Sequence, residues 1–91
     1  MTLTIYSRPG CHLCDEMKAV VAETIRGQDH ITVEDVDISS DPELESRYGL
    51  EIPVLLIDGT RVAKYRVGEA ELRRAIVSRA RGGETAGGAG T

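Results

Sequence analysis

The sequence predicts one α/β domain built from a four-stranded mixed sheet and three helices. Short runs of leucine and β-branched residues alternate with segments in which apolar residues recur every three or four positions, the spacing of a helix with one buried face. The 91 residues leave room for one domain only. A hydrophobic content of 41% suffices for a small core, although Phe and Trp are absent.

The first part of the chain predicts a strand–helix–strand unit. Leu3 to Tyr6 form a short apolar run that is followed by a turn over residues 7–10. From Leu13 to Ile25 the apolar residues have helical spacing, and Gly27 is a suitable stop. The β-branched residues between Ile31 and Ile38 predict a second strand. A right-handed crossover makes the two strands parallel.

The middle of the chain predicts a short helix and a hairpin. Asp41-Pro42 supplies an N-cap acid and a proline at the first helical position, and the helix ends at Gly49. The continuous apolar run Pro53–Ile57 predicts a central strand that is buried on both faces. The Asp58-Gly59 turn then leads into a fourth strand, Arg61 to Arg66.

The C-terminal part predicts a helix and a tail. Glu69 to Arg81 have helical spacing, with acids in the first turn and arginine in the last, as the helix dipole favours. From Gly82 to Thr91 half of the residues are glycine and no large apolar residue occurs, so we expect disorder. The predicted organisation is a domain over residues 1–81 and a disordered tail over 82–91. The strand order 2-1-3-4 is that of a small thioredoxin-like fold.

Charge and composition exclude several classes of function. The net charge of −4, from 11 basic and 15 acidic residues, argues against nucleic acid as a partner. No apolar stretch approaches the roughly 18 residues of a membrane span, and the N-terminus has no signal-peptide pattern. Two cysteines three positions apart close too short a loop to stabilise a small secreted protein. We therefore expect a cytoplasmic protein without nucleic-acid or membrane partners.

The segment Cys11-His12-Leu13-Cys14 lies at the predicted junction of the first strand and the first helix. Unpaired backbone N–H groups and the helix dipole favour a thiolate there. A lower pKa would make Cys11 reactive at neutral pH. Residues i and i+3 share one helix face, with Cβ atoms about 5–6 Å apart, so the two sulfurs can bond reversibly. A CxxC motif in a cytosolic βαβ pattern predicts a thioredoxin-like redox centre.

The segment from Tyr6 to Cys14 resembles the active-site segment of glutaredoxins, in which a basic residue, here Arg8, lies three positions before the first cysteine. Ile52-Pro53-Val54 resembles the cis-proline segment of that family, and Val67-Gly68 lies where the family has a Gly-Gly pair. The similarity in element order extends from residue 2 to about residue 80. The chain is thus similar to small bacterial glutaredoxin-like proteins of the thioredoxin superfamily.

This resemblance implies dithiol–disulfide exchange. Cys11 would be the exposed nucleophile that attacks a substrate disulfide, and Cys14 would then attack Cys11 and release the reduced product. Arg8 can stabilise the Cys11 thiolate by its charge, and His12 can set the redox potential because it lies between the cysteines. For Arg8 and His12 the alternative is a solvated turn residue. For the two cysteines, the alternative is that they serve only as small buried apolar residues.

The resemblance also implies a substrate-binding surface. A cis bond before Pro53 would turn the backbone of Ile52 toward the cysteines, where its N–H and C=O groups could pair with an extended substrate. The alternative is a proline that simply opens a strand. Gly68 remains from the Gly-Gly pair and would belong to the same surface.

The chain departs from the glutaredoxin pattern where that family holds glutathione. Leu50 replaces a basic or amide residue, and Glu51 replaces a threonine and would repel a carboxylate. Val67 replaces one glycine, and Glu69 adds a negative charge, whereas Glu71 keeps an acid that could meet an amino group. The acids at 69 and 71 also suit the first turn of a helix. We therefore expect the redox chemistry but not the glutathione partner.

The expected enzyme is a monomer that reduces protein or small-molecule disulfides with the Cys11–Cys14 pair and no other cofactor. Its electrons would come from a low-molecular-weight thiol or a flavoprotein reductase. A non-enzymatic alternative remains open, in which the same thiols serve a redox sensor or carry an iron–sulfur cluster between two chains. A metal site within one chain is not expected, because His12 should point to another face than the cysteines and His30 lies in a loop beyond the helix. An arsenate reductase is also not expected, because the sequence lacks a convincing set of anion-binding arginines.

Overall fold

Four strands and three α-helices follow one another in the predicted order within the described part of the chain. The computed structural model describes the backbone of residues 1–89 and the side chains of residues 1–80. The elements are β1 (Thr2–Ser7), α1 (His12–Thr24), β2 (Thr32–Asp37), the 3₁₀ turn η1 (Ile38–Ser40), α2 (Pro42–Tyr48), β3 (Val54–Ile57), β4 (Thr60–Lys64) and α3 (Glu69–Ala89).

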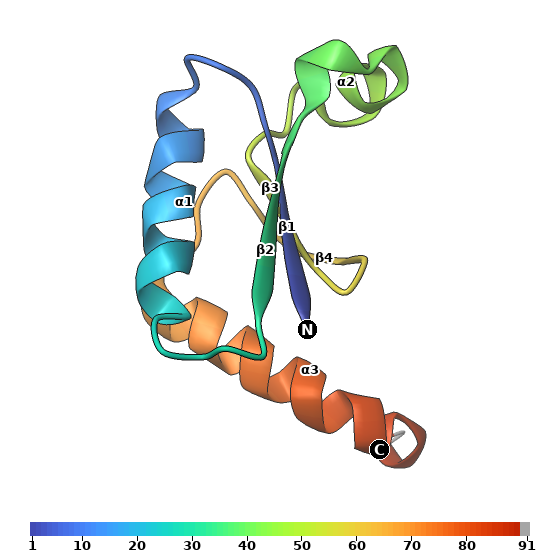
Figure 1. Cartoon of the computed structure of the whole chain (residues 1–91). Coiled ribbons are helices and arrows are strands. Elements are labelled where there is room, and N and C mark those ends of the chain that lie inside the picture. Colours follow the sequence, from blue (N-terminus) through green and yellow to red (C-terminus); the bar gives the residue numbers. More distant parts are fainter. Residues whose placement is uncertain (90–91) are drawn as a thin grey trace.

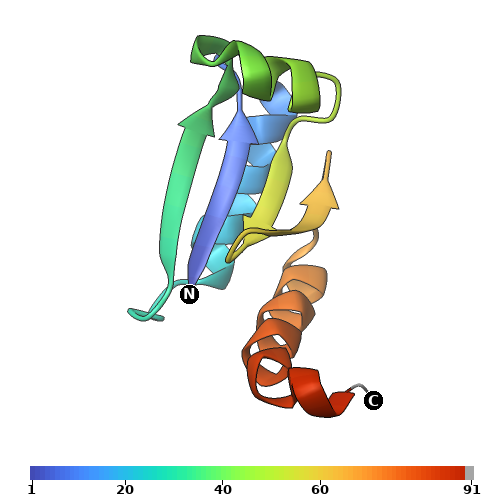
Figure 2. The same cartoon turned by 90° about the vertical axis from the view of Figure 1, so that its right-hand side faces the viewer.

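The four strands form one mixed sheet in the order β2-β1-β3-β4. β1 pairs with β2 in parallel and with β3 antiparallel, and β3 pairs antiparallel with β4. α1 lies along one face of the sheet, and α2 lies across the end of the sheet to which β1 points (Figures 1 and 2). This arrangement confirms the predicted fold class and strand order.

The core lies between the sheet and the helices α1 and α3. All four residues of β3 are buried, which confirms the predicted central strand. Leucine, isoleucine, valine and methionine fill the space in place of the missing Phe and Trp. The buried members of this cluster are Leu3, Ile5, Met17, Val21, Ile31, Leu55, Ile57, Val67, Leu72 and Ile76.

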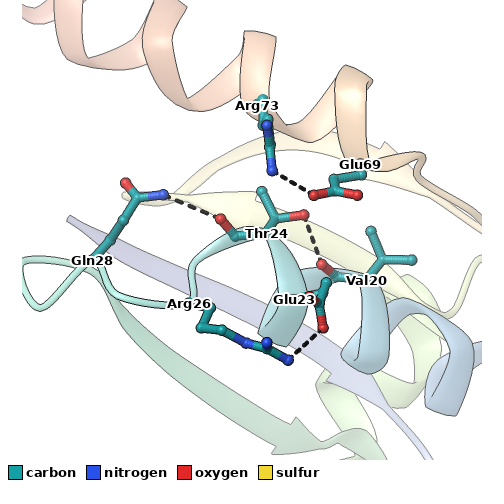
Figure 3. A network of polar contacts seen from close by, with 7 residues as sticks. All are labelled: Val20, Glu23, Thr24, Arg26, Gln28, Glu69 and Arg73. Atoms are coloured by element: carbon teal, nitrogen blue, oxygen red, sulfur yellow. Dashed lines mark hydrogen bonds and ion pairs between the residues drawn. The ribbon is translucent and has the colours of Figure 1, made fainter.

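Polar contacts close the last turn of α1 next to α3 (Figure 3). The buried Thr24 donates a hydrogen bond from Oγ1 to the Val20 carbonyl (2.7 Å), and Gln28 Nε2 donates to the Thr24 carbonyl (3.1 Å). Gly27 has a left-handed φ of 81°, which residues with a side chain rarely adopt. The chain can therefore leave the helix here and turn into β2.

β2 is one residue shorter at each end than predicted. Ile31 and Ile38 lie outside the strand, but both are buried. They supplied much of the β-branched signal, yet they fill the core where the chain turns into and out of the strand. Ile38 begins the 3₁₀ turn η1, which periodicity did not indicate.

The fourth strand starts at Thr60 and ends at Lys64, not at Arg66 as predicted. Tyr65 stops it, because its left-handed φ of 70° turns the backbone out of the ladder. The Tyr65 N–H donates instead to the Pro53 carbonyl (2.8 Å).

The predicted end of the last helix at Arg81 is wrong, because α3 continues to Ala89. Each glycine in a helix costs only about 1 kcal/mol relative to alanine, and no proline interrupts the stretch after Arg81. The tail predicted over residues 82–91 therefore starts as helix, and its last two residues lie outside the described ones. No helix that the structure describes is long and apolar enough to cross a membrane.

Removing the chain after Arg81 should leave the melting temperature nearly unchanged. The α3 residues of the core cluster, Leu72 and Ile76, lie well before this point. As a control, Leu72→Ala should destabilise the full chain by about 2–5 kcal/mol, because Leu72 is fully buried. Thermal and denaturant unfolding measure both changes. A large loss of stability on truncation would show that the last residues contribute to the fold.

Candidate active site

The two cysteines lie at the junction of β1 and α1. Cys11 is the N-cap of α1, and its Sγ accepts a hydrogen bond from the Cys14 N–H (3.2 Å). The Cys11 N–H donates to the Arg8 carbonyl (3.2 Å), which closes the turn before the helix. Gly10 in this turn has a left-handed φ of 82°. The local sequence therefore places the Cys11 sulfur at the positive end of the helix dipole.

Cys11 and Cys14 are joined by a disulfide, with their Cα atoms 5.2 Å apart. The two differ in exposure: Cys14 is fully buried, whereas Cys11 is partly exposed. An incoming thiolate or disulfide therefore has access to Cys11 and not to Cys14.

Pro53 lies at the same end of the sheet as this turn. The register pairs Tyr6 with Val54 across β1 and β3, which places Pro53 level with Ser7, where the turn begins. The Ile52–Pro53 peptide bond is cis. Pro53 is buried and Ile52 is half-buried.

Gly68 lies before α3, and its N–H donates a hydrogen bond to Glu71 Oε1 (3.3 Å). A side chain at this position would meet nothing within 4 Å, so the fold itself does not require glycine here. The preceding residues Tyr65 and Val67 line a pocket of about 190 Å³ together with Leu13, which lies between the two cysteines. The loop before α3 therefore borders the cysteine turn.

Arg8 pairs with a carboxylate, whereas His12 only lies near one. The Arg8 guanidinium forms an ion pair with Glu45 of α2. The His12 side chain is 89% exposed and lies 3.7 Å from Glu16 Oε2. Arg8 is therefore a partly neutralised cation, and His12 extends into solvent.

A polar pocket of about 230 Å³ lies beside the turn over residues 8–10. Asp35 on β2 accepts a hydrogen bond from the buried Ser7 hydroxyl (2.8 Å) and forms an ion pair with Lys18, whose Nζ lies 2.8 Å from its carboxylate. Asp37 and Asp15 complete its acidic lining. Periodicity gave no signal for this pocket, because its residues come from β1, α1 and β2.

Sequence reasoning also missed Glu45. It was assigned no role, because nothing in the sequence pairs it with a residue 37 positions away. Among the side chains of residues 1–80, no three His, Cys, Asp or Glu residues are arranged to hold a metal ion. His30 is exposed, and its carbonyl accepts a bond from the N-terminal amine.

Asp37, the last residue of β2, has a lowered pKa. Its pKa is lowered from the ordinary value of 3.8, first by hydrogen bonds from the Ser39 hydroxyl (2.6 Å) and the Ser39 N–H (2.9 Å). The positive charges of Lys18 and Arg8 act in the same direction.

Comparison with known proteins places these features in a family. A family model described as "Glutaredoxin-like domain (DUF836)" matches residues 2–77. A "Glutaredoxin-like protein YDR286C homolog" from Dictyostelium discoideum is 25% identical over 77 residues, which are 79% of this chain and 71% of that protein. The expected resemblance to glutaredoxin-like proteins is confirmed.

Solved structures agree with this result. The solution structure of a structural genomics target from X. campestris, XcR50, has a TM-score of 0.71 and 35% identity, covering 86% of this chain and 95% of that one. A thioredoxin variant from Halobacterium salinarum has a TM-score of 0.58 and 29% identity, covering 85% and 72%. A thioredoxin fold with a CxxC pair at this position indicates a redox function.

Ser39→Ala should raise the pKa of Asp37 toward 3.8, because it removes the hydroxyl that stabilises the carboxylate. A lowered folded pKa adds stability above the unfolded pKa that is lost as the pH falls through the folded value. The stability advantage of the parent chain over the variant should therefore shrink below pH 3.8. Carboxyl NMR titration and denaturant unfolding measure the two effects.

Ser40→Ala is the matched control, because the Ser40 hydroxyl bonds to the Asp37 backbone carbonyl (3.1 Å) and not to its carboxylate. An equal pKa change in both variants would contradict the assigned cause.

Proposed function

The chain belongs to the glutaredoxin-like family, and we propose that it is a dithiol–disulfide oxidoreductase that works through Cys11 and Cys14. The observation that supports this most directly is the unequal exposure of the pair, with Cys11 accessible and Cys14 fully buried. Exchange through a mixed disulfide needs one sulfur that meets the substrate and one that is protected until the second step.

In the reduced protein, the Cys11 thiolate attacks one sulfur of a substrate disulfide. A new bond joins Cys11 to that sulfur, and the other substrate sulfur leaves as a thiolate. Cys14 then loses its proton and attacks Cys11, so the second substrate sulfur also leaves with its electron pair. Two electrons have passed from the cysteine pair to the substrate, and the Cys11–Cys14 disulfide remains.

Two features of α1 favour the Cys11 thiolate. The Cys14 N–H points at Cys11 Sγ at 3.2 Å, and a hydrogen bond to the charged form lowers a pKa. The position of Cys11 as the N-cap adds the field of the helix dipole. Both contributions come from the backbone, so they hold whichever side chains surround the turn.

The substrate would bind along the turn before β3. The backbone N–H and C=O of Ile52 pair with an extended segment of the substrate. The space next to Gly68 is open, because a Cβ atom there would meet nothing within 4 Å. Protein disulfides in flexible segments suit this mode. Electrons return from a thiol or a flavoprotein reductase, and a cytoplasmic location would keep these donors at hand.

Cys14→Ser should trap substrates as stable mixed disulfides on Cys11, because the attack that releases them is removed. Cys11→Ser should abolish exchange. Insulin reduction and mass spectrometry of trapped adducts measure both outcomes. Trapping by Cys11→Ser instead would reverse the assigned roles. A coloured purified protein that fails to reduce insulin or a model mixed disulfide would favour the cluster-carrier alternative.

Glutathione should be a poor electron donor. Leu50 replaces a group that helps hold it, and this leucine is 94% exposed. Val67, which replaces one glycine of the family's Gly-Gly pair, belongs to the core cluster. Each missing charged hydrogen bond forfeits about 1.5–3 kcal/mol, so two lost contacts weaken binding by roughly a hundredfold or more. Rates of reduction by glutathione, other thiols and a flavoprotein reductase measure the difference.

The structure modifies the expected repulsion by Glu51. Its carboxylate is paired with Arg61 and lies 3.8 Å from Lys64 Nζ, so part of its charge is balanced. The double change Leu50→Arg with Glu51→Thr should still speed the glutathione reaction, and Leu50→Arg should supply most of the gain. Efficient reduction of the parent chain by glutathione would contradict the prediction.

A further inference from the structure

Arg8 is the cation closest along the chain to the reactive disulfide. Its carbonyl accepts the Cys11 N–H at 3.2 Å, so the two residues form one tight turn. Its guanidinium, however, turns toward α2 and pairs with Glu45. An approaching thiol therefore meets the combined charge of the Arg8 guanidinium and the Glu45 carboxylate.

Gly49, which follows the last residue of α2, lies next to this ion pair. Gly49 has a right-handed φ of −55°, so its conformation does not call for glycine. A Cβ atom there would lie 2.5 Å from the Glu45 carbonyl oxygen and 3.2 Å from Arg8 Nη2. Glycine at 49 is therefore needed for space, and it leaves room for the guanidinium at the end of the helix.

Stability does not explain the pair. The side chains of Arg8 and Glu45 are 37% and 43% exposed, and ion pairs with this exposure add little to folding. Glu45 Oε1 is buried and has no hydrogen-bond partner among the residues that the structure describes. A buried oxygen without a partner is unfavourable and calls for a reason beyond packing.

We propose that Glu45 removes a preference for anionic thiols in the reduction of the Cys11–Cys14 disulfide, by cancelling the positive charge of Arg8. The proposal rests on the oxidoreductase function above and names its electron donor more closely. With Arg8 balanced, an anionic thiol gains no attraction at the site, and donors are used with little regard to their charge. Without Glu45 the site would favour thiols that carry a remote carboxylate.

The reaction is a pair of exchanges. One external thiolate attacks Cys11, forms a mixed disulfide and releases Cys14 as a thiolate. A second thiolate attacks the external sulfur of that mixed disulfide, so Cys11 leaves as a thiolate and the two external sulfurs become bonded. Two electrons pass from the two thiols to the protein. Arg8 and Glu45 take no part in bond changes and act only through their fields.

Three small thiols test the proposal on the oxidised full chain: 3-mercaptopropionate, 2-mercaptoethanol and cysteamine, which carry a negative, a neutral and a positive remote group. Rate constants are expressed per thiolate, and the same thiols are compared across the variants, so differences in thiol pKa and nucleophilicity cancel between chains. The measured quantity is the ratio of the 3-mercaptopropionate rate to the cysteamine rate. The chains are the parent, Glu45→Gln, Arg8→Gln and the double variant.

Glu45→Gln should raise this ratio, and Arg8→Gln should lower it, because each leaves one charge unbalanced. One unbalanced unit charge near the site should change each rate by about two- to fivefold. The double variant should return to the parent ratio. High salt should bring the rate ratios of all four chains to the same value, since the Debye length falls from about 10 Å at 0.1 M to about 3 Å at 1 M.

Glu43→Gln is the matched control, because it removes the same charge from the exposed first turn of α2 without touching the ion pair. An unchanged ratio in Glu45→Gln, or an equal change in Glu43→Gln, would overturn the proposal while leaving exchange by 2-mercaptoethanol intact. Failure of all three thiols to reduce the parent chain would overturn the oxidoreductase function, and this proposal with it.

Discussion

The structure depends above all on the pairing of β1 with both of its neighbours. Tyr6 lies opposite Val36 of β2 and Val54 of β3. Because β2 is parallel and β3 antiparallel to β1, the residues after Tyr6, those after Val36 and those before Val54 reach the same end of the sheet. There the cysteine turn, the 3₁₀ turn with its aspartate and the cis-proline segment meet, although they lie far apart in the sequence. The buried side chains of Leu3 and Ile5 hold this central strand in place against α1 and α3.

Balanced charge is the second feature that shapes the site. Arg8 pairs with Glu45, Lys18 with Asp35, and Arg61 with Glu51. Each pair joins two different segments of the chain, so it also sets where those segments lie. Individually such exposed pairs contribute only about 0–1 kcal/mol to stability. For the Arg8–Glu45 pair, the proposed larger effect is on the charge that an incoming thiol meets near the disulfide.

The position of α2 shows how a small core is extended without Phe or Trp. The rings of Tyr6 and Tyr48 have their centres 4.7 Å apart, which joins the end of α2 to the central strand. No α2 residue is fully buried, so this helix relies on such side contacts and on its Asp41 cap. Tyr65 connects the remaining loops, because its hydroxyl donates to the Leu50 carbonyl (3.1 Å) and its N–H to Pro53.

The sequence by itself determined the order of elements, the parallel first pair and the placement of Cys11 at a helix N-terminus, because hydrophobic period and cap chemistry act over a few residues. The ends of the helices and strands depend on the tertiary structure. Tyr65 ends its strand because of its backbone conformation, and Ile38 leaves its strand because its side chain fills the core. Arg8 was expected near a thiolate, yet it pairs with Glu45. Contacts between residues 37 positions apart leave no local pattern, so only the folded chain brings such charges together.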